Sequence, residues 1–202
     1  MRTWVAVTFV TIGTPYEKEV ERLVRSAADL FIPLVVYRVE NKGNWRVNLC
    51  SKSEVILRAM DDHPGTDIVF VDADAAFREW PLLFDELSQD GTVDLAACFF
   101  EKSRLERWEL LSGTLWIANT DRGRELVKAW DEYGRKDLLV RHQKALRIVL
   151  VRAEGKYRVF KLPDSYTRIF DHPGMRGVKP VIEHFQASRR FRRALVKKGG
   201  SR

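Results

Sequence analysis

Two aspartates one residue apart follow four apolar, β-forming residues in the segment IVFVDADAAF at positions 68–77. A buried charge is costly, so a carboxylate pair at the end of a buried strand needs a partner that neutralises it. Residues i and i+2 of a strand point to the same side, and we therefore expect Asp72 and Asp74 to reach one ligand. Mg²⁺ or Mn²⁺ prefers oxygen ligands and commonly bridges to substrate phosphates. In the alternative, one aspartate caps the next helix and the other pairs with an arginine such as Arg78.

The elements that must position these aspartates are predicted strands that alternate with predicted helices. Capping patterns mark two helix starts: Thr14 with Pro15 and Glu17, and Ser51 with Glu54. Strands are expected at residues 4–10, 33–39, 68–71, 94–100, 112–120, 157–162 and 178–182, and helices after Thr14 and at 51–60, 81–87, 121–133 and 142–151. This alternation predicts an α/β sandwich with a mixed, mostly parallel central sheet. Ligands of such sheets bind at the carboxyl ends of strands, where Asp72 and Asp74 lie.

Length and composition indicate one ordinary soluble domain, because 202 residues with 45% hydrophobic and 31% charged content suffice for a core. No apolar run is long enough to cross a bilayer. The apolar segment near the N-terminus lacks a small-residue cleavage site and is interpreted as a core strand, not a signal peptide. Cys50 and Cys98 have no close Cys or His partners, which argues against a zinc site or a disulfide framework. We therefore expect a cytoplasmic protein.

The net charge of +7 is concentrated at the C-terminus. Seven of the 35 Lys and Arg residues lie in Ser188–Arg202, which contains no acid, so the rest of the chain has 28 basic and 28 acidic residues. Such a basic block is a plausible contact for a polyanion, either nucleic acid or an anionic membrane. It is equally typical of a solvated terminus.

Two enzyme classes use a D-x-D motif after a hydrophobic strand. The segment resembles that of haloacid-dehalogenase-like phosphatases, whose first aspartate is a nucleophile. However, Ala76 stands where those enzymes have Thr or Val. In those enzymes the motif also lies on the first strand, whereas two predicted strands precede it in this chain. This interpretation therefore ranks second.

A broader resemblance is to the compact GT-A glycosyltransferases, such as glycogenins and lipopolysaccharide galactosyltransferases. It rests on the order of DIVFVDADAAF, DLAA, SGTLWIANT and PVIEHFQASR along the chain. The resemblance implies a Rossmann-like GT-A domain over residues 1–187, followed by a basic tail at 188–202. It also implies that Asp72, Asp74 and His184 hold Mn²⁺ or Mg²⁺. Imidazole suits Mn²⁺, although a histidine packed beside Phe185 is the structural alternative.

The resemblance further implies a nucleotide-diphosphate sugar as donor, with a UDP-sugar expected. The implied donor-binding residues besides Asp72 are Thr8, Thr11, Tyr16, Lys52, Ser112, Gly113 and Thr114. A tyrosine can stack on a base or pack on its helix, and a glycine can permit close approach or mark a bulge. Lys52, placed near a helix N-terminus, would contact the donor phosphate or sugar.

Candidate catalytic residues are Gln143, His142, Glu101 and Asp171, with His172 beside them. Gln143 matches a polar helix start that reaches the sugar in relatives. The family commonly has Asp before that Gln, whereas this chain has His142, so the role of the position is open and His142 could act as a base. An inverting enzyme would need such a base and a retaining enzyme need not.

The acceptor is expected to be polyanionic or held at a membrane. We place DNA first, because small enzymes of this kind in phage glycosylate hydroxymethylated pyrimidines, and a phage enzyme would act in the host cytoplasm. A flipped base needs aromatic support, and several tryptophans are available. The alternatives are a lipopolysaccharide or other glycan acceptor, and a non-catalytic nucleic-acid-binding module.

Overall fold

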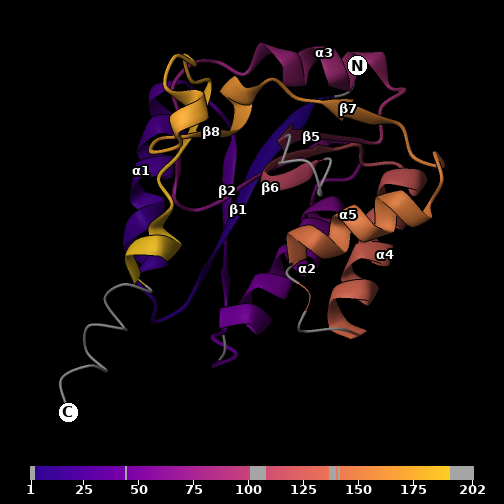
Figure 1. The fold of residues 1–202 in the computed structure, drawn as a ribbon, viewed down its shortest axis with the longest axis horizontal. Helices are drawn as coiled ribbons and strands as arrows, with labels where there is room; N and C mark the ends of the chain where they lie inside the picture. The colour runs from indigo at the N-terminus through magenta and orange to yellow at the C-terminus, as the bar shows by residue number, and fades with distance from the viewer. Residues whose placement is uncertain (1–2, 44, 101–107, 137–139, 141, 192–202) are drawn as a thin grey trace.

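A mixed sheet of six strands forms the centre of the molecule, in the order β2-β1-β3-β6-β5-β7 (Figure 1). The computed structural model describes residues 3–43, 45–100, 108–136, 140 and 142–191. The strands are β1 (Trp4–Thr11), β2 (Leu34–Val39), β3 (Asp67–Val71), β5 (Leu95–Phe100), β6 (Glu109–Ile117) and β7 (Val159–Lys161). Among these described strands, only β6 runs antiparallel to its neighbours. The predicted mixed, mostly parallel sheet is confirmed.

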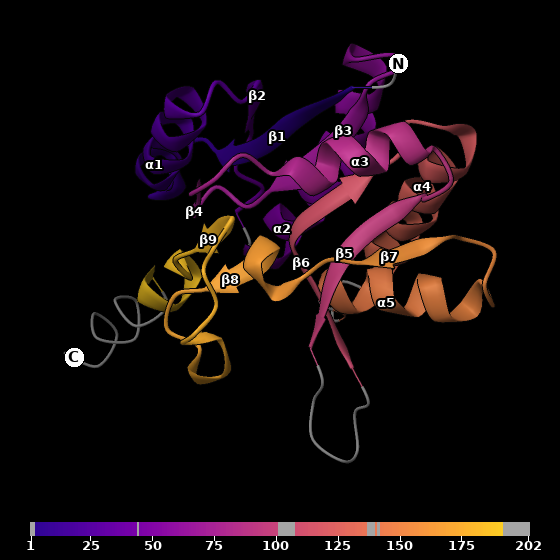
Figure 2. The ribbon, with the colours of Figure 1, turned by 90° about the horizontal axis from the view of Figure 1, so that it is seen from above.

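Helices cover both faces of the sheet, as Figures 1 and 2 show. One face carries α1 (Tyr16–Asp29) and α3 (Leu82–Asp90), and the other carries α2 (Trp45–Asp62), α4 (Asp121–Lys136) and α5 (His142–Arg152). The alternation of side chains along β1 explains this division. Val5 and Val7 pack with α2, α4 and α5, whereas Trp4 and Ala6 pack with α1 and α3. The result is the predicted α/β/α sandwich.

A smaller sheet of three strands lies beside the carboxyl end of β3. Its order is β4 (Ala75–Phe77), β9 (Ile182–His184) and β8 (Arg168–Ile169). β9 pairs antiparallel with β4 and places His184 opposite Ala75. Short 3-10 turns at Asp164–Thr167 (η1) and Pro173–Met175 (η2) connect the surrounding loops. This sheet therefore carries a late segment of the chain to the two aspartates.

Two predicted helix starts were wrong. α2 begins at Trp45 rather than Ser51, and its first turns are tied to the preceding loop by the Lys42 amide, which donates to Asn48 Oδ1 over 2.8 Å. The Ser51 hydroxyl is buried and, among the described residues, has no hydrogen-bond partner, so it caps nothing. In α1 the cap is Pro15, because the Thr14 hydroxyl donates to the Thr11 carbonyl instead of accepting from the helix.

Other boundaries also moved. The late strand predicted at 178–182 begins only at Ile182. The backbone of Val181 is hydrogen-bonded instead to the Ser165 carbonyl and the Arg78 amide, in a loop. β6 begins at Glu109 and ends at Ile117 rather than Thr120. Thr120 does cap α4, as predicted, by accepting from the Gly123 amide over 3.1 Å. Within the described part of the chain, no helix combines the length and apolar character needed to cross a membrane.

Candidate active site

Asp72 and Asp74 directly follow the carboxyl end of β3, as predicted, and lie in the turn between β3 and β4. The turn is closed by the Ala75 amide, which donates to the Asp72 carbonyl over 3.0 Å, and the Asp72 amide donates to the Gly113 carbonyl over 2.8 Å. These backbone bonds fix the turn on β6. The two carboxylates converge because of the turn, rather than because of the strand pleat.

His184 completes a group of three ligand atoms with the two aspartates. One atom from each of Asp72, Asp74 and His184 lies within 4.8 Å of the others. His184 Nε2 is 2.9 Å from the Thr114 hydroxyl, so this hydroxyl occupies one ring nitrogen and orients the ring. A Cβ on Gly113 would lie 2.9 Å from His184 Cε1, 3.1 Å from His184 Nδ1 and 3.3 Å from Asp72 Oδ2. Only glycine leaves this space between the histidine and the carboxylate open.

The ionisation of these residues also suits a cation. Burial and then the neighbouring Asp72 raise the pKa of Asp74 to about 6, which shows that the site accommodates two negative charges poorly. Burial lowers the pKa of His184 to about 4, so its imidazole is neutral and able to ligate at neutral pH. Two carboxylates and one neutral imidazole fit Mn²⁺ or Mg²⁺ in ligand type and charge.

Lys52 lies in the interior of α2, which begins at Trp45, and not near the start of the helix as predicted. Its side chain is only 2% exposed. The ammonium donates to Asp72 Oδ1 and to the Ser112 carbonyl, each over 2.7 Å, and lies 4.6 Å from the centre of the Phe70 ring. Lys52 thus places a buried positive charge beside the aspartates.

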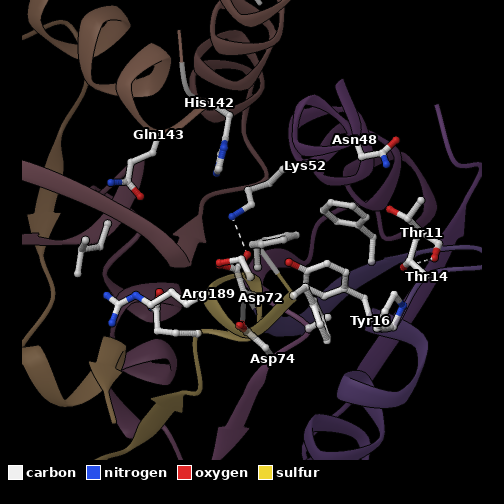
Figure 3. A pocket seen from close by; sticks show the side chains of 18 of the residues that line it. Thr11, Thr14, Tyr16, Asn48, Lys52, Asp72, Asp74, His142, Gln143 and Arg189 are labelled. Atoms are coloured by element: carbon white, nitrogen blue, oxygen red, sulfur yellow. Dashed lines mark hydrogen bonds and ion pairs between the residues drawn. The ribbon is translucent and has the colours of Figure 1, made fainter. Parts of the chain in front are cut away.

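A cavity of about 780 Å³ opens over the aspartates and Lys52. Figure 3 shows Thr11, Thr14, Tyr16 and Asn48 on one side of Asp72, and His142, Gln143 and Arg189 on the other. The first group comes from β1, the loop after it, α1 and α2, and the second from α5 and the C-terminal segment. The cavity therefore has two ends, with the carboxylates between them.

The α5 end of the cavity is polar and internally bonded. His142 Nε2 is 2.9 Å from the Ser112 hydroxyl, and Gln143 Nε2 donates to Glu109 over 2.8 Å. Burial and then the charge of Lys52 lower the pKa of His142 well below its usual range. Its Nδ1 atom is buried and has no hydrogen-bond partner within the described residues. A neutral His142 can bind a hydroxyl, but it is a weak base.

Several other predicted site residues lie outside the cavity surface. Thr8 is buried within β1. Ser112 and Thr114 are buried on β6, where their hydroxyls are hydrogen-bonded to His142 and His184. The Asp171 carboxylate pairs with Arg189, at 2.9 and 3.0 Å, and the neighbouring His172 lines the cavity. Glu101 lies outside the described residues.

Arg189 and Phe191 line the cavity, although the sequence pattern assigned them to a basic tail. Residues 187–191 form a helical turn, and the Ala187 amide donates to Asp74 Oδ2 over 2.6 Å. The available sequence signal was an aromatic residue inside a run of arginines, SRRFRR. That signal does not show which surface the segment contacts.

Comparison with solved structures identifies the fold. The chain resembles a glycosyltransferase involved in the glycosylation of the major capsid of PBCV-1, with a TM-score of 0.69 and 14% identity over 93% of this chain and 97% of that one. GlyE, a glycosyltransferase of Streptococcus pneumoniae TIGR4, matches with a TM-score of 0.61 and 16% identity over 90% of this chain and 55% of that one. Mouse xyloside xylosyltransferase 1 matches with a TM-score of 0.55 and 10% identity over 92% and 98%. No protein-family model and no curated protein sequence matches. The chain thus has the GT-A-like fold of these glycosyltransferases.

Proposed function

We propose that this protein is a metal-dependent glycosyltransferase that moves a sugar from a nucleotide-diphosphate sugar, with a UDP-sugar expected, to an acceptor hydroxyl. The observation that carries the proposal is the convergence of Asp72, Asp74 and His184 within 4.8 Å at a cavity of about 780 Å³. The fold shared with three glycosyltransferases supports the reaction class. The fold does not favour the phosphatase alternative, because β1 and β2 both precede the aspartates, whereas the phosphatase motif lies on the first strand.

The residues around the aspartates would have different roles in sugar transfer. Asp72, Asp74 and His184 would hold Mn²⁺ or Mg²⁺, which supplies positive charge for the diphosphate leaving group. Lys52 places a second positive charge beside Asp72, where it can stabilise the charge that develops on that leaving group.

The α5 end of the cavity would receive the transferred sugar. Gln143 and the neutral His142 offer hydrogen-bonding groups, and Glu109 and Ser112 hold them in place. His142 is proposed to orient the sugar rather than to act as a general base, because its pKa is far below neutral and its Nε2 is bonded to Ser112.

The acceptor is proposed to be polyanionic, and DNA with hydroxymethylated pyrimidines is the first candidate. The charge of the C-terminal segment supports this, although Arg189 and Arg190 are paired with Asp171 and Glu19. Five basic residues remain in 192–202. Incubation with a labelled donor and either hydroxymethylcytosine DNA or oligosaccharides would separate the acceptor classes. Label on the glycans alone would refute the DNA proposal.

Binding measurements test the donor class. We expect a nucleoside diphosphate or its sugar to raise the melting temperature only when Mn²⁺ or Mg²⁺ is present. Asp74→Ala should abolish this shift, and the exposed Asp90→Ala should preserve it. Equal binding without metal would contradict the proposal. A phosphatase would instead release phosphate from an aryl phosphate and lose that activity in Asp72→Asn.

A further inference from the structure

The helical turn 187–191 is fixed to one stripe of α1. Three residues of α1, which are three positions apart along the helix, contact the segment 185–191. Tyr16 meets Phe191 with ring centres 5.3 Å apart, Glu19 pairs with Arg190 over 2.7 Å, and the Arg22 guanidinium lies 4.1 Å from the centre of the Phe185 ring. Residues at this spacing share one face of a helix. α1 therefore presents a continuous docking surface for the segment.

The same segment is tied to the predicted metal ligand Asp74. The Ala187 amide donates to its carboxylate over 2.6 Å, and the Phe185 amide donates to its carbonyl over 2.9 Å. Gln186, between them, has a positive φ of 51°, a conformation that a side chain of this kind rarely adopts. Gln186 adopts this strained conformation where the chain turns from β9 into the helical turn. Such backbone strain clusters at functional sites.

Phe191 and Tyr16 together form an aromatic corner in the wall of the cavity. Both residues line the cavity, and their ring planes meet at 80°. Phe9 also lines the cavity. A flat heteroaromatic ring can stack on one ring of such a corner while its edge contacts the other. Figure 3 shows Tyr16 at the Thr11, Thr14 and Asn48 end of the cavity, away from Gln143, and the Phe191 ring lies beside that of Tyr16.

We propose that Phe191, on the C-terminal turn, is a base-binding residue that holds the nucleobase of the donor in the corner with Tyr16. This inference rests on the proposed function and adds a nucleotide contact from the segment that the sequence alone assigns to a basic tail. A base is the only extended aromatic part of a nucleotide sugar, and bases stack favourably on aromatic side chains. The adjacent aspartates and Lys52 would then lie where the diphosphate follows the nucleoside.

The test compares ligands with and without a base on the full chain. The nucleoside diphosphate that binds the wild type most tightly among UDP, GDP and ADP is titrated by calorimetry with Mn²⁺, beside inorganic pyrophosphate. Phe191→Ala should weaken binding of the nucleotide about tenfold and leave pyrophosphate binding within about twofold, as expected from the energy of one stacked base. Phe191→Trp should retain binding, and Phe191→Leu, which keeps apolar volume without a ring, should fall between.

Phe170→Ala is the matched control, because Phe170 is 45% exposed and stacks on Phe185 but does not line the cavity. It should bind both ligands as the wild type does. Equal nucleotide affinity in Phe191→Ala and the wild type would overturn the inference while the proposed function stands. An equal loss for nucleotide and pyrophosphate would also overturn it, because Phe191 would then only shape the site. Failure of the wild type to bind any nucleotide with metal would remove both proposals.

Discussion

The ammonium of Lys52 lies 2.7 Å from Asp72 Oδ1, inside the fold and beneath the cavity. The lysine is fully buried, whereas the side chain of Asp72 is 38% exposed. The ion pair therefore connects a buried charge to a carboxylate that solvent and ligands can reach. Lys52 already neutralises one of the two carboxylates. A cation that binds Asp72 must therefore share this carboxylate with the lysine.

Lys52→Met is predicted to change metal binding and turnover in opposite directions. Loss of the ammonium frees Asp72, so Mn²⁺ should bind the nucleotide-free protein more tightly. Donor hydrolysis should fall about 100-fold, because a positive charge beside the leaving group is lost. Calorimetry with Mn²⁺ and a hydrolysis assay measure the two effects. Exposed Lys128→Met should change neither, and weaker Mn²⁺ binding in Lys52→Met would contradict this account.

The sequence predicted the strands and helices because their hydrophobic periodicity is local, and it identified Asp72 and Asp74 because charge after an apolar strand is unusual. It misplaced Lys52 relative to its helix, since Asn48 and the 41–43 loop start α2 before the apparent cap at Ser51. The contact between Phe191 and Tyr16 was beyond prediction. It depends on the register of β9 against β4, which no local pattern specifies.

Asp74→Asn is predicted to stabilise the metal-free protein at pH 7 more than at pH 4. The pKa of Asp74 is raised to about 6, so the folded state favours the protonated acid. The stability that the protonated Asp74 carboxyl contributes is fully present below about pH 4 and is lost as the pH rises through 6. Asparagine cannot ionise, so the free energy of unfolding should rise by about 3 kcal/mol at pH 7. Urea denaturation at both pH values checks this, and an equal effect at the two values would argue against it.

Gly113→Ala is predicted to weaken Mn²⁺ binding at least tenfold with little loss of secondary structure. The added Cβ would meet the His184 ring at 2.9 Å and the Asp72 carboxylate at 3.3 Å, and so would separate two predicted ligands. Gly134→Ala is the matched control, because no atom lies within 4 Å of its added Cβ. Alanine there should stabilise α4 by about 0.5–1 kcal/mol and leave Mn²⁺ affinity unchanged. Equal Mn²⁺ affinity in both variants would refute the role of Gly113.

Two truncations are predicted to separate the C-terminal segment into parts with different roles. A chain that ends at Phe191 keeps Arg189 and Phe191 at the cavity, so it should bind nucleotide normally. It lacks five basic residues and should lose most salt-dependent DNA binding, with the slope of log affinity against log salt reduced by up to about 4.5. A chain that ends at Ala187 should also lose nucleotide binding. Fluorescence anisotropy across a salt series measures DNA affinity, and unchanged DNA binding after the shorter deletion would exclude residues 192–202 as the DNA contact.

The most direct test of the central claim is turnover of a panel of nucleotide sugars by the purified protein, followed as release of the nucleoside diphosphate with and without Mn²⁺. We predict that at least one nucleotide sugar, with a UDP-sugar expected, is hydrolysed or transferred only with the metal, and that Asp74→Asn abolishes this turnover. Release at the same rate in the presence of a chelator, or in Asp74→Asn, would contradict a metal-dependent glycosyltransferase built on Asp72, Asp74 and His184.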